Sequence, residues 1–212
     1  MARRIGAGWK DDAGMVKVGL TGGAASGKTT VCRLFREKGV AVSIADELAR
    51  EAVSPGSPGF DAVVAWFGDG VVGEDGGLDR PALRRKLISD PEARRVLESI
   101  VQPEVIRLMK VFLEREEASG AVMAVCEVPL LFELNLEAMF DVTLHVGVDR
   151  ATQCARLMER DGVAEAEAMR LLDLQLPDGD KRDRADLVIE NMRGLSELKG
   201  AFYKVFEKIV KK

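Results

Sequence analysis

The feature that most constrains this chain is a glycine-rich stretch at residues 22–29, which matches the pattern G-x-x-x-x-G-K-[ST] at every position. Its residues are Gly22, Gly23, Ala24, Ala25, Ser26, Gly27, Lys28 and Thr29. An apolar segment typical of a buried strand precedes this stretch, and residues 30–35 read as an opening helix. A strand, a glycine-rich loop and a helix in this order predict a phosphate-binding loop. We call residues 22–29 the phosphate loop.

The chemistry of such a loop is local. Glycines remove side chains from a tight turn, so that consecutive backbone N–H groups can converge on phosphate oxygens. The positive end of the following helix points at the same place. Lys28 can reach the terminal phosphates, and the Thr29 hydroxyl can bind Mg²⁺. The alternative, a glycine-rich turn with an ordinary surface lysine, does not account for the flanking strand and helix.

Composition excludes several classes of function. The formal net charge of −4 over 212 residues does not predict general attraction to nucleic acid or to a membrane, and no apolar run reaches the length of a membrane span. The cysteines Cys32, Cys126 and Cys154 contain no C-x-x-C pair, so we predict neither a zinc site nor a disulfide framework. Free thiols favour a cytoplasmic location. His145, the single histidine, lies in a predicted strand and is interpreted as structural.

Strand-like and helix-like segments alternate along the chain. Five segments are predicted to be strands, at residues 15–20, 40–45, 121–128, 141–148 and 185–191. The helical patterns between them predict a parallel sheet with right-handed crossovers. The expected fold class is therefore α/β, with a three-layer α/β/α core around a five-stranded parallel sheet.

Two longer stretches do not belong to this alternation. Residues 57–118 contain several helical patterns, including a helix from Asp90-Pro91 and a separate long helix over about 104–118. Residues 150–184 read as helical pieces with a break at Pro177-Asp178-Gly179-Asp180. Residues 1–14 lack periodicity and are predicted to be a loose extension, so that Met15 could be the natural start.

Two acidic residues are candidates for chemistry, because α/β sheets bind ligands at the carboxyl ends of their strands. Asp46 follows the predicted strand 40–45 and is either a general base or the cap of the next helix. Glu127 lies at the end of a strongly apolar strand, where a buried acid needs a partner. Phosphate-loop proteins often place there an acid that supports Mg²⁺ through water.

Basic residues gather in two places. Arg156, Arg160 and Lys181 belong to a run of cations within 150–184, and cations on a mobile flap can neutralise charge during phosphoryl transfer while the flap excludes water. An exposed charged hairpin is the alternative, and the presence of the phosphate loop favours the lid. Arg80 opens a second basic stretch, which is a solvated face unless an anion binds there.

Further segments resemble the dephospho-CoA kinase family, from Val16 to about Val210. They are Leu20-Thr21-Gly22-Gly23, Ala45-Asp46-Glu47-Leu48-Ala49-Arg50, Gly77-Leu78-Asp79-Arg80 with Leu83, Val128-Pro129-Leu130-Leu131-Phe132-Glu133, and the spacing Arg156…Arg160-Asp161…Gln175…Lys181…Ala185-Asp186. The string after the apolar strand, V-P-L-L-F-E, is the most distinctive of them.

The resemblance implies transfer of the ATP γ-phosphate to the ribose 3′-hydroxyl of dephospho-CoA, the last step of CoA biosynthesis, with Mg²⁺. It implies a core of the nucleoside-monophosphate-kinase type at 15–56, 119–149 and 185–212, a CoA-binding helical insertion at 57–118 and a lid at 150–184. The expected partner is the small-molecule acceptor, with no nucleic acid and no membrane, and the expected state is a monomer or a weak homo-oligomer.

The resemblance also implies residue roles. Asp46, Lys28 and Arg160 would be catalytic. ATP would contact the phosphate loop, Thr30, Arg156 and Lys181. The acceptor would lie against Arg50, Arg80, Leu83, Gln102, Pro129, Leu130 and Glu133. Thr29 and Glu127 would serve the metal.

One departure concerns the acceptor side. The family usually has a His-Pro pair where this chain has Gln102-Pro103, and glutamine can donate a hydrogen bond but cannot carry charge. A second enzyme hypothesis is a kinase for another nucleoside or nucleotide-like acceptor. A hypothesis from another class is a nucleotide-binding regulator, which would sense the γ-phosphate through mobile loops.

Overall fold

A computed structural model describes residues 14–211, so that residues 1–13, nearly all of the predicted N-terminal extension, lie outside the described part. The described chain divides into two compact units. Unit 1 consists of the chain up to Val42 together with Arg115–Lys212, and unit 2 consists of Ser43–Glu114. Each unit is described here by itself.

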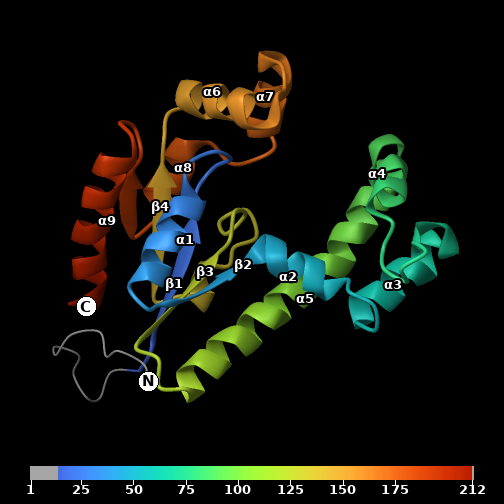
Figure 1. Ribbon diagram of the computed structural model, residues 1–212, viewed down its shortest axis with the longest axis horizontal. Coiled ribbons are helices and arrows are strands. Elements are labelled where there is room, and N and C mark those ends of the chain that lie inside the picture. The colour runs from blue at the N-terminus through green and yellow to red at the C-terminus, as the bar shows by residue number, and fades with distance from the viewer. Residues whose placement is uncertain (1–13, 212) are drawn as a thin grey trace. The chain divides into compact units, whose positions relative to one another are not determined.

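A five-stranded parallel sheet carries the phosphate loop (Figure 1). Its strands are β1 (Val16–Thr21), β2 (Ala41–Ile44), β3 (Met123–Glu127), β4 (Val142–Gly147) and β5 (Leu187–Glu190), in the spatial order β2-β3-β1-β4-β5. β1 is central because its neighbours are β3 and β4, with which it pairs in parallel. β3 and β4 are buried along their whole length, as their apolar sequences predict.

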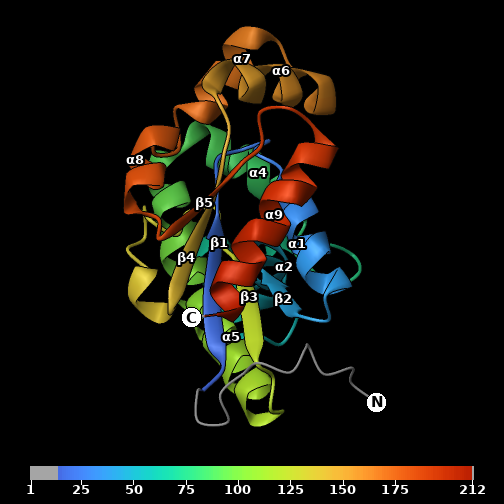
Figure 2. The same cartoon turned by 90° about the vertical axis from the view of Figure 1, so that its left-hand side faces the viewer.

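Helices cover both faces of this sheet. α1 (Lys28–Glu37) and α9 (Leu195–Val210) pack on one face, where Phe35 meets Phe202 edge to face with ring centroids 4.9 Å apart. The short helix α8 (Asp178–Arg184) lies on the other face (Figure 2). The predicted three-layer α/β/α core is therefore confirmed.

Residues 150–184, which were predicted to form a lid and which we call the lid region, contain two further helices before α8. α6 (Arg150–Asp161) is capped by Asp149, whose side chain accepts a hydrogen bond from the Thr152 N–H. α7 (Glu165–Leu172) folds back on α6, and buried apolar residues of the two helices form a small core of their own. A short 3₁₀ helix, Glu137–Met139, lies between β3 and β4.

Unit 2 is helical around a separate core. Its elements are α2 (Ala45–Ala52), α3 (Pro58–Phe67), a 3₁₀ turn at Asp69–Val71, α4 (Arg80–Ser89) and most of α5 (Pro91–Ala118). Ser57 caps α3 and Asp79 caps α4 through side-chain hydrogen bonds to backbone N–H groups. Apolar side chains of α3, α4 and α5 form the core of this unit.

The expectation of two helices on either side of Gln102-Pro103 is wrong. α5 is one helix of 28 residues with Pro103 inside it. Proline removes one backbone N–H donor, which usually ends or kinks a helix. Burial of Ala93 before the proline and of Met109 after it offsets that loss. Unit 2 begins at Ser43, whereas the helical insertion was predicted to begin at residue 57.

The three cysteines are free, as predicted, and all three are buried. Burial raises the pKa of the Cys126 thiol to about 12, and burial, with a smaller effect from Glu127, does the same for Cys32. Both thiols are therefore protonated and unreactive at neutral pH. Among residues 14–211, no helix is long and apolar enough to cross a membrane.

Candidate active site

The phosphate loop has the backbone that its glycines predict. Gly22 and Gly27 have φ angles of 155° and 99°, which side chains rarely adopt. A Cβ atom on Gly22 would lie 2.6 Å from the Ser26 Oγ, and one on Gly27 would lie 2.3 Å from the Asn191 Nδ2. The positive φ angles and these close neighbours disfavour a side chain at either position.

Two groups inside the loop are suited to an anion. The Ser26 hydroxyl is buried and has no hydrogen-bond partner among the residues that the structure describes. α1 begins at Lys28, and its N-cap, Gly27, supplies no side-chain bond to the first N–H groups of the helix. A helix start that no side chain caps, beside a buried hydroxyl, is what a phosphate would bind.

Lys28 is held within the same loop. Its Nζ donates to the backbone oxygens of Gly22 at 2.9 Å and Gly23 at 3.0 Å, and lies 3.9 Å from the Oε1 of Glu127. Glu127 is buried at the end of β3, directly beside Leu20 in the register of β1. The structure thus gives Glu127 the charged partner that an acid in an apolar strand needs.

Both metal ligands predicted from sequence, Thr29 and Glu127, carry an oxygen of the kind that Mg²⁺ prefers. Thr29 is exposed in the first turn of α1, and Glu127 supplies a carboxylate in unit 1. The described residues contain no cluster of three or more His, Cys, Asp or Glu side chains that could hold a metal ion. Such a cluster is not required, because Mg²⁺ in these loops takes most of its ligands from phosphates and water.

Residues of the lid region hold the apex of the phosphate loop. The Gln153 Nε2 donates to the Ala24 oxygen at 3.1 Å, and the Ala24 N–H donates to the Gln175 Oε1 at 3.0 Å. Two side-chain amides, one from α6 and one from the segment after α7, therefore bond to the backbone N–H and C=O of a single loop residue, Ala24. Sequence reasoning missed Gln153, because an isolated glutamine on a helix carries no signal of its own.

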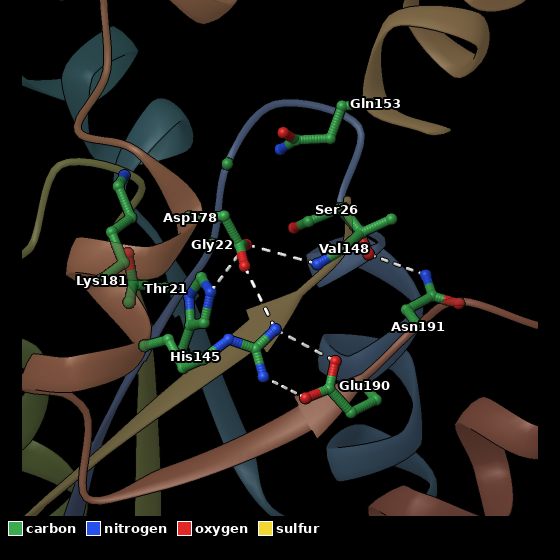
Figure 3. A network of polar contacts seen from close by, with 12 residues as sticks. Thr21, Gly22, Ser26, His145, Val148, Gln153, Asp178, Lys181, Glu190 and Asn191 are labelled. Atoms are coloured by element: carbon green, nitrogen blue, oxygen red, sulfur yellow. Dashed lines mark hydrogen bonds and ion pairs between the residues drawn. The ribbon is translucent and has the colours of Figure 1, made fainter. Parts of the chain in front are cut away.

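Arg156 and Asn191 complete this support. The Arg156 guanidinium donates to the Ala25 oxygen at 3.4 Å and to the Asn191 oxygen at 3.0 Å. The Asn191 Nδ2 in turn donates a hydrogen bond to the backbone oxygen of Ser26 in the loop, at 2.7 Å (Figure 3). Ala25 has a φ of 56°, in the left-handed region, so these bonds hold a costly backbone conformation in place. Of the predicted lid cations, Arg156 is the one that contacts the loop directly in the described bonds.

Arg160 and Lys181, also expected to be lid cations, have other partners. Arg160 is exposed and forms a double hydrogen bond with the neighbouring Asp161 at 2.7 Å, which raises the arginine pKa. Lys181 is completely buried on α8, where it pairs with Glu133 at 2.8 Å. The structure therefore brings together the phosphate loop, Glu127 and Arg156. The Lys181 ammonium, in contrast, is buried and bonded to the post-β3 residues Pro129 and Glu133.

A polar network anchors α8 to the sheet (Figure 3). The buried His145 on β4 places its Nε2 2.9 Å from the Asp178 Oδ1, and Arg182 joins Asp178 to Glu190 on β5. Burial opposes ionisation of Asp178, but the His145 contact, the Val148 N–H and Arg182 together outweigh it and lower the Asp178 pKa. These contacts agree with the interpretation of His145 as structural.

We expect Asp178→Asn to lower the free energy of unfolding at neutral pH by about 1 to 3 kcal/mol, because bonds to a charged acceptor are lost. Since the Asp178 pKa is lowered in the folded state, its contribution is complete above the ordinary aspartate pKa and is lost as pH falls through the folded value. Urea unfolding of both proteins across this range measures the difference. Asp180→Asn, an exposed residue of the same helix, is the control. A deficit that does not shrink in acid would contradict this account.

The predicted acceptor residues of unit 2 lie on its helices. Asp46 and Arg50 are exposed, one turn apart on α2. Ile44 is the N-cap residue of α2, with no side-chain cap bond in the described chain, so the cap alternative for Asp46 is wrong. Arg80 is exposed at the start of α4, and Gln102 is half-buried on α5. Leu83 is buried in the core of the unit.

The predicted acceptor residues of unit 1 follow β3. Pro129, Leu130 and Glu133 belong to residues 129–133, which we call the post-β3 turn. The Pro129 oxygen accepts from Thr21 Oγ1 at 3.3 Å, and the Glu133 Oε1 accepts from the Leu176 N–H at 3.0 Å. Thr21 directly precedes the phosphate loop, so the post-β3 turn is bonded to the strand that carries the loop.

Comparison with known proteins shows the family by sequence. The family model described as dephospho-CoA kinase matches residues 16–197. The dephospho-CoA kinase of Halalkalibacterium halodurans is 43% identical over 86% of this chain and 90% of its own length. That of Anaeromyxobacter dehalogenans is 44% identical over 86% of this chain and 87% of its own length. A crystal structure of a Thermus thermophilus protein superposes with a TM-score of 0.77 at 36% identity, covering 92% of this chain and 98% of that one.

Proposed function

This chain belongs to the dephospho-CoA kinase family, and from that premise we propose that it transfers the γ-phosphoryl group of ATP to the ribose 3′-hydroxyl of dephospho-CoA. The observation that supports the proposal most is the phosphate loop, which combines a helix start without a side-chain cap, the buried Ser26 hydroxyl and the Lys28 ammonium bonded to the loop oxygens. Family membership supplies the identity of the acceptor, and the product is CoA, at the end of its biosynthesis.

The donor side of the reaction follows from the loop. Backbone N–H groups of residues 25–30 would bind the β- and γ-phosphates, and Lys28 would exchange its bonds to the loop oxygens for phosphate oxygens. Thr29 would bind Mg²⁺ directly, with Glu127 as an outer partner. Bound Mg²⁺ would neutralise charge on the phosphates. Gln153, Gln175 and Arg156 would keep the loop in this conformation, since they already bond to its apex.

The acceptor side requires a proton acceptor. The 3′-oxygen forms a bond to the γ-phosphorus while the bond from that phosphorus to the bridging oxygen of ADP breaks, and the hydroxyl proton must leave. We assign that proton to the Asp46 carboxylate, which is exposed and does not cap its helix. Arg50, Arg80, Gln102 and the post-β3 turn would hold dephospho-CoA.

We also propose that Arg160 stabilises charge on the transferred group when the lid region encloses the substrates. Arg160→Ala should then lower turnover by about tenfold to a hundredfold, because charge stabilisation is strongest in the transition state, with little change in the ATP dissociation constant. Arg150→Ala, which removes an exposed arginine of the same helix that pairs with Asp173, is the control. An equal loss in turnover and in ATP binding would indicate uniform binding instead.

The proposal as a whole is tested by ADP release in a coupled assay with purified protein, ATP and Mg²⁺. Dephospho-CoA should stimulate ADP release, whereas nucleoside monophosphates and adenosine should not. Stimulation by one of those compounds alone would identify a kinase for another acceptor. Nucleotide binding without stimulation by any acceptor would favour a regulatory protein.

A further inference from the structure

Lys181 is the most deeply buried charge in the described part of the lid region, with no exposed surface. A buried ammonium group requires partners, because its hydration is lost. Its Nζ lies 2.8 Å from the Glu133 Oε1 and donates to the Pro129 oxygen at 3.0 Å. Pro129 and Glu133 are the first and last residues of the post-β3 turn. One ammonium group therefore joins the two ends of that turn.

We propose that the ion pair between Lys181 and Glu133 is a positioning device, which fixes the post-β3 turn for the acceptor and ties it to the phosphate loop. The proposal rests on the proposed function in one respect, because that function places dephospho-CoA against the turn. It assigns Lys181 a different role from that of a lid cation, since the amino group is occupied by the turn and is shielded from any ligand.

Two paths lead from the ion pair to the phosphate loop. The Glu133 Oε1 also accepts from the Leu176 N–H, and the neighbouring Gln175 accepts from the Ala24 N–H at the apex of the loop. The Pro129 oxygen, which Lys181 holds, is also bonded by Thr21, the residue before the loop. The phosphate loop and the post-β3 turn are therefore connected by short chains of hydrogen bonds.

The helix that carries Lys181 is itself fixed. Asp178 and Arg182, three residues before and one residue after Lys181, face β4 and β5 through His145 and Glu190 (Figure 3). A helix of seven residues is not stable by itself. These contacts on one side allow Lys181 to act as a rigid support for the turn on the other.

The ion pair can be removed without leaving a buried charge. Lys181→Met or Glu133→Gln alone leaves one partner unpaired, which is strongly destabilising, whereas removal of both is often tolerated. The test therefore uses both single variants and the double variant. The matched control is Lys17→Met with Glu117→Gln, which removes a Lys–Glu pair with a 3.0 Å contact from unit 1 by the same two substitutions. Lys17 lies near the start of β1, at the opposite end from the phosphate loop.

We expect the double variant to fold and to be more stable to heat than either single variant. Its KM for dephospho-CoA should rise by at least about tenfold, because small misplacements of a substrate-positioning element have large kinetic effects, while its KM for ATP stays within about twofold of the wild type. The control double variant should keep both values. An unchanged KM for dephospho-CoA in the double variant would overturn the proposal. So would a raised KM for ATP in Lys181→Met with none in Glu133→Gln, because that pattern marks a phosphate contact.

A second measurement does not depend on activity. Hydrogen exchange followed by mass spectrometry should show faster exchange of the backbone amides of residues 130–136 in the double variant and no change there in the control. Unchanged exchange would overturn the proposal even if the kinetics differ. If the wild-type protein does not respond to dephospho-CoA, the proposed function fails, and the exchange experiment still decides whether the ion pair holds the turn.

Discussion

Lys28→Ala should lower the rate of phosphoryl transfer by at least about a thousandfold, the upper range for loss of one preorganised donor to a reacting group. The lysine ammonium lies within the phosphate loop, 2.9 Å from the Gly22 oxygen, and no other side chain of residues 22–29 carries a positive charge. Single-turnover kinetics with saturating ATP measure the loss, and equilibrium titration with ATP shows how much of it is ground-state binding.

The control for this prediction is Lys38→Ala, which removes the lysine at the end of the same helix. Lys38 packs its amino group over the Tyr203 ring, 4.8 Å from the centroid, and does not belong to the loop. We expect near wild-type transfer in that variant. Thermal unfolding of both proteins separates loss of function from loss of fold. Intact kinetics in Lys28→Ala would remove the basis of the donor site.

Asp46→Asn should lower turnover by at least about a hundredfold, the low end of the range for a lost general base, while ATP binding persists. Asparagine keeps the size of the side chain but cannot accept the hydroxyl proton. Glu47→Gln is the matched control, because Glu47 is the next residue of α2 and is also an exposed acid in its first turn. Steady-state kinetics at saturating ATP and dephospho-CoA measure both variants.

The measurements on Asp46→Asn distinguish a role as general base from a role in the stability of α2. A structural role would lower the melting temperature together with turnover, whereas a base would lower turnover alone. If Asp46→Asn and Glu47→Gln retain similar, near-normal turnover, Asp46 is not the base and another proton acceptor must be sought in the complex.

The core of the fold could be predicted because its signals are local. The phosphate-loop pattern fixes a strand before it and a helix after it, and β1 and α1 are found there. Apolar runs identified the remaining strands, since a parallel sheet covered on both faces has few polar positions. Gly39, with a φ of 78°, ends the first helix region as its position after Lys38 predicts.

The course of α5 could not be predicted from local signals. Pro103 suggested two helices, because the residue before a proline is biased away from helical backbone. The helix continues because burial on both sides of the proline, at Ala93 and Met109, outweighs one lost hydrogen bond. Contacts of this kind join residues far apart in the sequence and leave no local pattern.

In the candidate site too, features set by local sequence could be predicted and features set by long-range contacts could not. The places of Lys28 and Thr29 at the start of α1 and of Glu127 at the end of β3 could be predicted, because the motif and the apolar strand specify them. Gln153 could not, because its role depends on a hydrogen bond to Ala24, 129 residues away in the sequence. For Lys181, charge and position in the lid region favoured a phosphate contact, yet its burial and its bond to Glu133 depend on how α8 packs. Basic residues in sequence identify charge but not its partner.

The most direct test of the proposed activity is identification of the product. Purified protein is incubated with ATP, Mg²⁺ and dephospho-CoA, and the product is analysed by mass spectrometry and by phosphorus NMR against authentic CoA, with Lys28→Ala as the blank. We predict one added phosphoryl group, located on the ribose 3′-oxygen, formed in equal amount to ADP. A phosphoryl group at another position, or ADP formed without any modified dephospho-CoA, would contradict the proposed function.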